Sequence, residues 1–260
     1  MRKYRECPKN STQHQDILNK NKSILKQKAL TYKLLPLNNR SKILDIGCGN
    51  GDDLNSVAKI SGYQGEYIGI SNDKNMINEA RYRYDHPALS FLFADANYTL
   101  PFSDNYFDGV RADRVFLYLK NPQYTLSEMI RVVRPEGNIL VNDTDVGTFL
   151  FGKENLNNIN RYYIETLATW FNNPWIGRQL YGIFKSSGLK NIKVYPATLT
   201  FTDFSAARKI YIIDQVIEKM VTLKRITSDQ GEQWLSYLQS QADKDKFFGI
   251  ANQFTVCANK

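Results

Sequence analysis

The sequence contains little cysteine, little histidine and no long hydrophobic run. Its 260 residues include three cysteines (Cys7, Cys48 and Cys257) and two histidines. Three widely spaced thiols match neither a disulfide framework nor a metal-ligand pattern, so we expect no metal site and a reducing, cytoplasmic location. No apolar run approaches the roughly 20 residues of a membrane-spanning helix, and the first residues have no apolar core of a signal peptide. We therefore expect no membrane span and no secretion.

The composition is that of a globular protein. Hydrophobic residues make up 42% of the chain and charged residues 23%, which excludes a disordered, collagen-like or coiled-coil chain. At this length the chain corresponds to one large domain or two small ones, and it can bury a substantial core.

Basic residues are concentrated near the N-terminus. The formal net charge of the chain is +8, and residues 1–33 carry nine basic and only two acidic side chains. Such a segment can bind nucleic acid or another anionic surface. Apolar residues at helical spacing favour instead an amphipathic helix with solvated lysines on its outer face. We therefore expect a basic arm and helix over residues 1–40 and leave nucleic-acid binding open. The apolar residues of this stripe are Ile17, Leu18, Leu25, Ala29 and Tyr32.

From residue 41 onward, short apolar segments alternate with helical ones. This repeated alternation predicts an α/β fold with a mostly parallel sheet and helices on both of its faces. The expected strands are 42–46, 66–70, 90–94, 107–111 and 137–142, and the expected helices between them are 51–61, 75–84 and 124–133.

After residue 150 the pattern becomes mainly helical. Two further strands, at 192–201 and 247–257, complete a seven-stranded sheet. The helical segments at about 153–188 and 205–243 predict a cap inserted before the last strand, within a domain spanning 41–260. Aromatic residues gather here, which suits binding of an apolar or ring-bearing small molecule or packing of the cap onto the sheet. They are Trp170, Phe171, Trp175, Tyr181, Phe184, Phe201 and Phe204.

The most informative segment is D-I-G-C-G-N-G at residues 45–51, between the first expected strand and the first expected helix of this alternation. Glycine at every second position lets the backbone turn tightly and approach a ligand closely. The N-terminus of the following helix suits a carboxylate or a phosphate. A dinucleotide-binding G-x-G-x-x-G would need glycine at position 52, which is Asp52, and the G-K-[ST] of triphosphate-binding loops is missing from the sequence.

This run resembles motif I of the class I S-adenosylmethionine-dependent methyltransferases. Four later segments resemble the same family in order and spacing, so the resemblance covers about residues 40–145. It implies a Rossmann-like fold and S-adenosylmethionine as the cofactor. A weaker similarity over 174–189 points to the small-molecule methyltransferases grouped with ubiquinone and menaquinone biosynthesis. The four segments are Y-I-G-I-S at 67–71, F-A-D-A at 93–96, L-P-F with F-D at 100–108, and I-R-V-V-R-P-E-G at 130–137.

The resemblance assigns residues to the methionine part of the cofactor. Gly47, Cys48 and Gly49 would lie against it in the turn. Asp45 would hold its ammonium group, directly or through water. Arg111, at the end of the fourth strand, would offer its backbone carbonyl to the same ammonium.

It also assigns residues to the adenosine part. Asp95 would accept a hydrogen bond from the adenine amino group, and the Ala96 N–H would donate to the ring. The family usually ends its second strand in Asp or Glu, which binds both ribose hydroxyls, whereas this chain has Ser71 followed by Asn72. A serine hydroxyl makes one neutral bond where a carboxylate makes two charge-assisted ones. We therefore expect a weaker ribose contact, unless Asp73 reaches back.

No obligatory catalytic residue can be named from the sequence. Methyl transfer from a sulfonium is an in-line displacement on an activated electrophile, so alignment and a dry pocket matter more than a base. The candidates at the carboxyl ends of the strands are Asp113, Asp145 and Tyr118.

The sequence thus predicts an S-adenosylmethionine-dependent methyltransferase acting on a small, aromatic or apolar acceptor. Two alternatives stay open. One is an RNA or protein methyltransferase that uses the basic N-terminal arm. The other is a catalytically silent binding or regulatory protein, because a fold does not guarantee an activity.

Overall fold

Seven strands form a single sheet in the computed structural model, which describes residues 17–18, 20–152 and 158–260. Their order across the sheet is β3-β2-β1-β4-β5-β7-β6. The pairings from β3 to β5 are parallel, and β7 runs antiparallel to both β5 and β6. This confirms the mostly parallel, Rossmann-like fold. The strands are β1 Lys42–Ile46, β2 Glu66–Ser71, β3 Leu89–Phe93, β4 Phe107–Asp113, β5 Val133–Phe151, β6 Lys190–Phe201 and β7 Gly249–Asn259.

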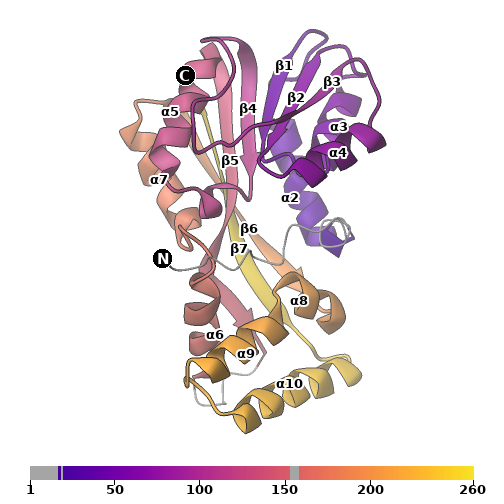
Figure 1. Cartoon of the computed structure of the whole chain (residues 1–260), viewed down its shortest axis with the longest axis vertical. Helices are drawn as coiled ribbons and strands as arrows, with labels where there is room; N and C mark the ends of the chain where they lie inside the picture. The colour runs from indigo at the N-terminus through magenta and orange to yellow at the C-terminus, as the bar shows by residue number, and fades with distance from the viewer. Residues whose placement is uncertain (1–16, 19, 153–157) are drawn as a thin grey trace.

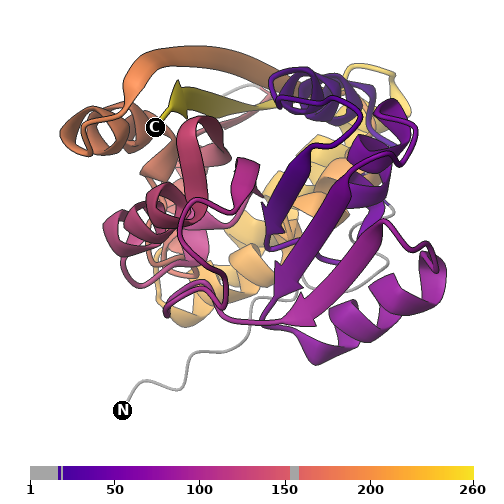
Figure 2. The same cartoon turned by 90° about the horizontal axis from the view of Figure 1, so that it is seen from above.

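Helices lie on both faces of the sheet (Figure 2). Side chains alternate between the faces of a strand, and β1 shows the result. Ile43 belongs to a cluster with residues of α3 and α4, whereas Leu44 and Ile46 belong to a second cluster that includes residues of α5 and α7. Both faces are therefore buried, as a parallel sheet requires. These helices are α3 Asp52–Ile60, α4 Lys74–Arg83, α5 Pro122–Val132 and α7 Ile176–Ser186.

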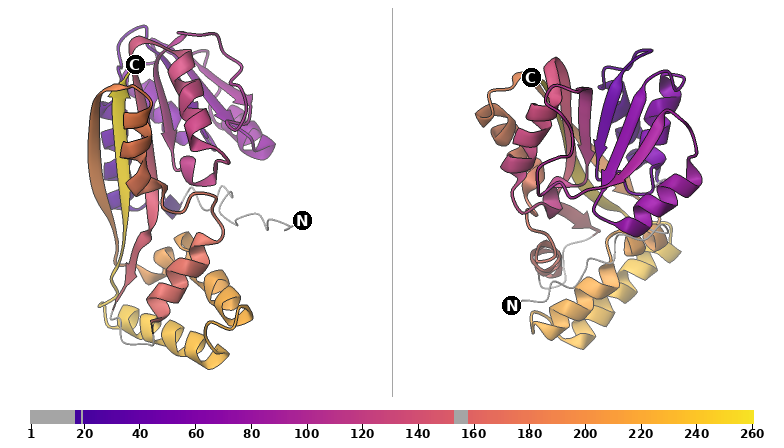
Figure 3. Two further views of the ribbon diagram at one scale, coloured as in Figure 1. Left: turned by 90° about the vertical axis from the view of Figure 1, so that its left-hand side faces the viewer. Right: turned by 45° about the horizontal axis from the view of Figure 1, so that its top comes forward.

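The three strands β5, β6 and β7 extend beyond the parallel part of the sheet and carry a helical cap at their far end (Figures 1 and 3). β5 alone has 19 residues, whereas its expected length was six, because its second half pairs with β7 and not with β4. Aromatic side chains fill the core of the cap, where the Tyr163 hydroxyl donates to the Tyr211 carbonyl at 2.6 Å. The cap helices are α6 Ile159–Ala168, α8 Phe204–Ile210, α9 Ile213–Thr222 and α10 Ser228–Asp243.

The structure divides the expected cap segments differently. α7 falls within the predicted cap segment 153–188, but it packs on β5 and β7 and covers the sheet. Its buried residues Ile176, Leu180 and Phe184 recur at helical spacing, which gives it an apolar face toward the strands. Within the expected helical segment 205–243, the chain is broken between α8 and α9 at Ile212, whose φ is +48°. Residues 153–157 of the first cap segment lie outside the described residues.

The N-terminal helix α2 (Lys22–Lys33) buries a face that the sequence did not predict. Its buried residues are Ile24, Gln27, Lys28 and Thr31, whereas Leu25, expected to face inward, is 44% exposed. The reason is that α2 packs against polar groups: the Gln27 side-chain amide donates to Asn142 Oδ1 at 3.1 Å and to the hydroxyl of Thr255. Residues 1–16, the first part of the basic arm, lie outside the described residues.

No helix in the described ranges combines the length and the apolar character that crossing a membrane requires.

Candidate functional site

The glycine turn lies at the carboxyl end of β1. The N–H groups of Gly47 and Cys48 both donate to the Ile70 carbonyl, at 2.8 and 3.0 Å, which fixes the turn against β2. Gly47, Gly49 and Gly51 all have positive φ, at +72°, +55° and +83°. Glycine adopts this left-handed backbone without the steric cost that other residues incur. The spacing of the glycines therefore has a conformational cause, as the sequence predicted.

A cavity of about 370 Å³ opens beside this turn, at the carboxyl edge of the parallel strands. Open α/β sheets bind their ligands at this edge. One half of the cavity, the cofactor half, is lined by all nine residues that the sequence assigned to the cofactor. They are Asp45, Gly47, Cys48, Gly49, Ser71, Asn72, Asp95, Ala96 and Arg111.

The other half of the cavity, the apolar half, is formed mainly by the long strands β5, β6 and β7 and by residues of the cap. Phe171 and Phe201 line it, whereas Phe184 is buried in the core and Tyr181 is exposed. Sequence reasoning missed Phe149 because β5 was expected to end at residue 142. It missed Tyr211, at the C-terminal end of α8, because no local pattern marked that residue. The apolar half consists of Val146, Phe149, Phe171, Leu199, Phe201, Ile210, Tyr211 and Ala251, and polar residues at its border are Tyr118, Thr144 and Gln253.

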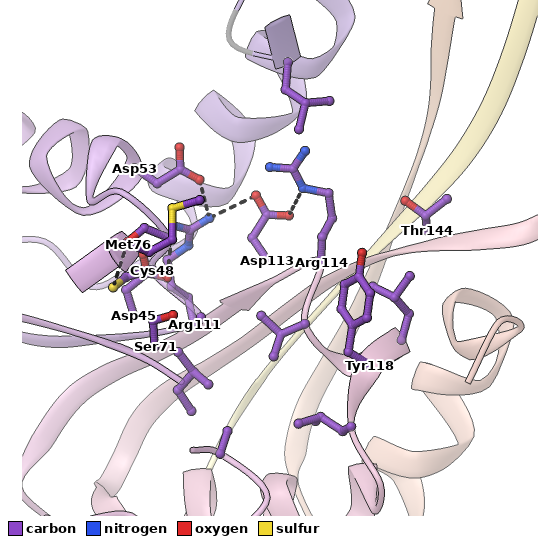
Figure 4. A pocket seen from close by; sticks show the side chains of 18 of the residues that line it. Asp45, Cys48, Asp53, Ser71, Met76, Arg111, Asp113, Arg114, Tyr118 and Thr144 are labelled. Carbon is purple, nitrogen blue, oxygen red and sulfur yellow. Dashed lines mark hydrogen bonds and ion pairs between the residues drawn. The ribbon is translucent and has the colours of Figure 1, made fainter. Parts of the chain in front are cut away.

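The side chain of Arg111 is fully buried beneath the cofactor half and binds three carboxylates. It makes ion pairs with Asp45 at 3.2 Å, with Asp53 at 3.3 Å and with Asp113 at 3.3 Å. The sequence assigned only its backbone carbonyl a role. The side chain links the motif aspartate of β1 to the start of α3 and the end of β4 (Figure 4).

Helix α2 completes this ion network. The Lys28 ammonium lies 2.7 Å from Asp53 Oδ1, and the Tyr32 hydroxyl donates to the same oxygen at 3.0 Å. Burial raises the pKa of the Asp45 carboxyl to about 7, although the nearby Arg111 guanidinium acts in the opposite direction. Burial acts to raise the pKa of the Asp53 carboxyl, but the positive charges of Lys28 and Arg111 outweigh it and hold this pKa below its usual range.

At the expected ribose position, the Ser71 hydroxyl accepts a hydrogen bond from the Asp73 N–H at 3.2 Å. The carboxylate of Asp73 does not reach back to Ser71 but caps α4, where Oδ1 accepts from the N–H groups of Asn75 and Met76. Both Ser71 and Asp73 line the cavity. The position of the usual family carboxylate is therefore occupied by a hydroxyl.

At the expected adenine position, Asp95 forms a turn with Asn97, whose backbone and side-chain N–H groups both donate to Asp95 Oδ1. Asp95 therefore both forms this turn and lines the cofactor half of the cavity.

The three catalytic candidates separate in the structure. Asp113 and Tyr118 line the cavity, whereas Asp145 does not. The Asp145 carboxylate is buried and pairs with Arg178, whose Nη2 lies at 2.8 Å, so it ties β5 to α7. The ring of Tyr118 packs against Phe171 with 5.4 Å between the centroids.

Comparisons with known proteins agree with this geometry. Residues 37–193 match the methyltransferase-domain family. An uncharacterized 37.1 kDa transposon protein of Streptomyces fradiae is 30% identical over 216 residues, 83% of this chain and 61% of its own length. The chain thus spans less than two thirds of that relative. The demethylmenaquinone methyltransferase of Bacillus cereus is 27% identical in an alignment 206 residues long that covers 70% of this chain and 85% of that enzyme.

Solved structures share the fold. The YcgJ protein of Bacillus subtilis superposes with a TM-score of 0.61 at 16% identity, covering 91% of this chain and 98% of its own. Phosphoethanolamine N-methyltransferase 2 of Haemonchus contortus, solved with S-adenosylmethionine, superposes with a TM-score of 0.59 at 19% identity, covering 97% of this chain and 59% of its own. With a family match over more than half of its length and the five motifs in order along this sheet, the chain belongs to the class I S-adenosylmethionine-dependent methyltransferases.

Proposed function

We propose that this chain transfers a methyl group from S-adenosylmethionine to a small, aromatic or apolar acceptor. The observation that carries the proposal is one cavity in which the predicted cofactor residues continue into an apolar half. When bound, the cofactor supplies an electrophilic methyl group on a sulfonium. The residues of the chain then have to hold both partners in line and keep water out.

The side chains of the cofactor half fit the chemical groups of this cofactor. The methionine part of the cofactor carries an ammonium group and a carboxylate. Asp45 offers a carboxylate to the ammonium, and the glycine turn before α3 offers N–H groups to the carboxylate. Ser71 and Asn72 offer hydrogen-bonding groups for the ribose hydroxyls. Asp95 and Ala96 offer an acceptor and a donor for the adenine ring.

The apolar half suits the acceptor, because ligand pockets combine apolar walls with a few polar groups that fix orientation. Phe149, Phe171 and Phe201 supply ring surfaces, and Tyr118 and Asp113 stand at the border between the halves. The similarity to a demethylmenaquinone methyltransferase supports a ring-bearing acceptor. Asp145 is not part of this proposal, since it lies outside the cavity and is paired with Arg178.

One observation favours a second function. Because Ser71 replaces the usual carboxylate, a catalytically silent protein that binds the cofactor weakly or not at all is the alternative. Calorimetric titration with S-adenosylmethionine and S-adenosylhomocysteine separates the two. Micromolar binding of both supports the methyltransferase, and no binding at millimolar ligand supports the silent protein.

The class of acceptor is tested with cofactor carrying a radiolabelled methyl group. The folded protein is incubated with a panel of naphthols, quinols and small aromatic acids, and in parallel with RNA and with protein. Label in an organic-extractable product supports the proposal. Label only in RNA or protein overturns the small-molecule acceptor while leaving the cofactor assignment intact.

A further inference from the structure

Arg114, one of the residues that line the cavity, has a strained backbone. It directly follows β4, and its φ of +57° places a long side chain in the left-handed region that favours glycine. The Arg114 N–H donates to the Asn142 carbonyl at 2.8 Å, which holds this conformation against β5. Strained residues of this kind cluster where a side chain must be aimed at a ligand. The conformation of Arg114 is therefore consistent with a ligand-binding role for its side chain.

The guanidinium of Arg114 is only partly neutralised. Its Nε lies 3.5 Å from Asp113 Oδ1, and its side chain is 20% exposed. The same carboxylate also pairs with Arg111 at 3.3 Å and accepts from the Asn142 amide at 2.7 Å. Asp113 is thus shared by two guanidinium groups. Within the described ranges, Nη1 and Nη2 of Arg114 have no hydrogen-bond partner.

Arg114 stands at the border of the two halves. In Figure 4 it lies beside Asp113, between Asp45 and Ser71 of the cofactor half on one side and Thr144 and Tyr118 on the other. The eight residues that define the apolar half include no carboxylate. A cation with accessible donors beside apolar walls attracts an anionic partner more strongly than the same cation in bulk water, because the effective dielectric constant there is lower. The carboxylate nearest to Arg114 is that of Asp113, which Arg111 also neutralises.

We propose that Arg114 binds an anionic oxygen of the methyl acceptor, so that the acceptor is an apolar or aromatic acid, either a carboxylate or a phenolate. This inference rests on the proposed function, because it assumes that the acceptor occupies the apolar half. The planar guanidinium presents two parallel N–H donors that match the two oxygens of a carboxylate, and one of these donors suffices for the single oxygen of a phenolate. Arg114 is thereby a specificity-determining residue that holds the acceptor at the junction with the cofactor half.

The test compares charged ligands with neutral counterparts of the same shape. Benzoate and 2-naphthoate are titrated against benzamide and 2-naphthamide in the presence of saturating S-adenosylhomocysteine. A phenol arm compares 4-nitrophenol, which is ionised at mildly alkaline pH, with 4-nitroanisole at the same pH and so distinguishes a phenolate from a carboxylate. We expect wild-type protein to bind at least one acidic member about tenfold more tightly than its neutral counterpart.

The variant Arg114→Gln should lose this preference while its affinity for the neutral ligand stays the same, which a merely structural role would not produce. Arg161→Gln is the matched control, because Arg161 lies on α6, is exposed and pairs with Glu165 far from the cavity lining. Should Arg114→Gln not fold, Arg114→Lys, which keeps the charge and loses the fork, should retain only part of the preference.

The proposal is overturned if wild-type protein binds no acid of the panel, if it binds acid and neutral counterpart equally, or if the preference survives in Arg114→Gln. The titration with S-adenosylhomocysteine is measured separately for every variant. Its failure in the wild type would count against the proposed function, whereas normal cofactor binding without acid preference would count only against this inference.

Discussion

Lys28 on α2 and Asp53 on α3 form a buried ion pair 2.7 Å long, and this pair joins the N-terminal helix to the cofactor half of the cavity. Asp53 continues the connection to Arg111, and Arg111 to Asp45. Helix α2 is therefore a wall of the site on its buried face, whereas Lys22, Lys26 and Lys33 on its outer face are exposed, as predicted. Lys28, although distant in sequence from the glycine turn, therefore contributes to the electrostatic environment of that turn.

Replacing Lys28 with methionine should lower the free energy of unfolding by about 3 kcal/mol, because it leaves the buried Asp53 carboxylate with one cation fewer. Urea unfolding measures this loss. Lys26→Met on the exposed face of the same helix is the control and should change the stability little. Adding Asp53→Asn to Lys28→Met should cost less than Asp53→Asn in the wild type, since both changes remove the same pair. If the losses in the free energy of unfolding are strictly additive, Lys28 and Asp53 are not energetically coupled.

Gly49→Val should abolish cofactor binding while the protein stays folded. The φ of Gly49 is +55°, a conformation that costs a residue with a side chain about 1–2 kcal/mol, and the added side chain would project from the cavity lining. Calorimetry with S-adenosylhomocysteine and a thermal melt provide the two readouts. Gly182→Ala in α7 is a matched glycine control, because an added Cβ there meets no atom within 4 Å. Wild-type affinity in folded Gly49→Val would remove the basis of the site assignment.

Ser71→Asp should tighten cofactor binding by about 1 kcal/mol, the gain expected when charge-assisted bonds replace a neutral one. Ser71→Asn, of similar size but without the charge, should gain little, and the two dissociation constants are compared at the same pH. Weaker binding in Ser71→Asp would mean that the carboxylate of Asp73, which lines the same cavity, repels the new charge.

Cofactor affinity should rise with pH around neutrality. Burial raises the pKa of Asp45 to about 7, so the carboxyl is mostly protonated one unit below that value and mostly ionised one unit above it. An ammonium group binds the ionised form better. The dissociation constant of S-adenosylhomocysteine should therefore fall by up to about tenfold between about pH 6 and about pH 8.

The control for this pH dependence is Asp45→Asn, which cannot ionise and should give a dissociation constant that varies little over the same range. An equally steep dependence in Asp45→Asn would assign the titration to another group and remove Asp45 from the ammonium-binding role.

Much of the cofactor half follows from local sequence. The glycine turn needs left-handed backbone at fixed positions, and each strand of a parallel sheet ends at the same edge, so motifs that follow β1, β2 and β3 converge without further information. This is why Asp45, Ser71 and Asp95, separated along the chain, all line one cavity. The resemblance of these motifs to the family, in the same order along the chain, predicted that convergence.

The tertiary structure alone decided the side-chain contacts between segments that are far apart in the chain. The sequence by itself determined the α/β fold and the glycine turn, because these depend on backbone preferences and on short-range hydrophobic periodicity. The resemblance to the methyltransferase family supplied the residues of the cofactor half. The sequence did not determine that Gln27 and Lys28 face inward, that the Arg111 side chain binds three carboxylates, or that Phe149 lines the apolar half. A helix buries a polar face only where a distant partner such as Thr255 satisfies it. The free energy of burying such a charge or amide depends on the partner and not on the local sequence.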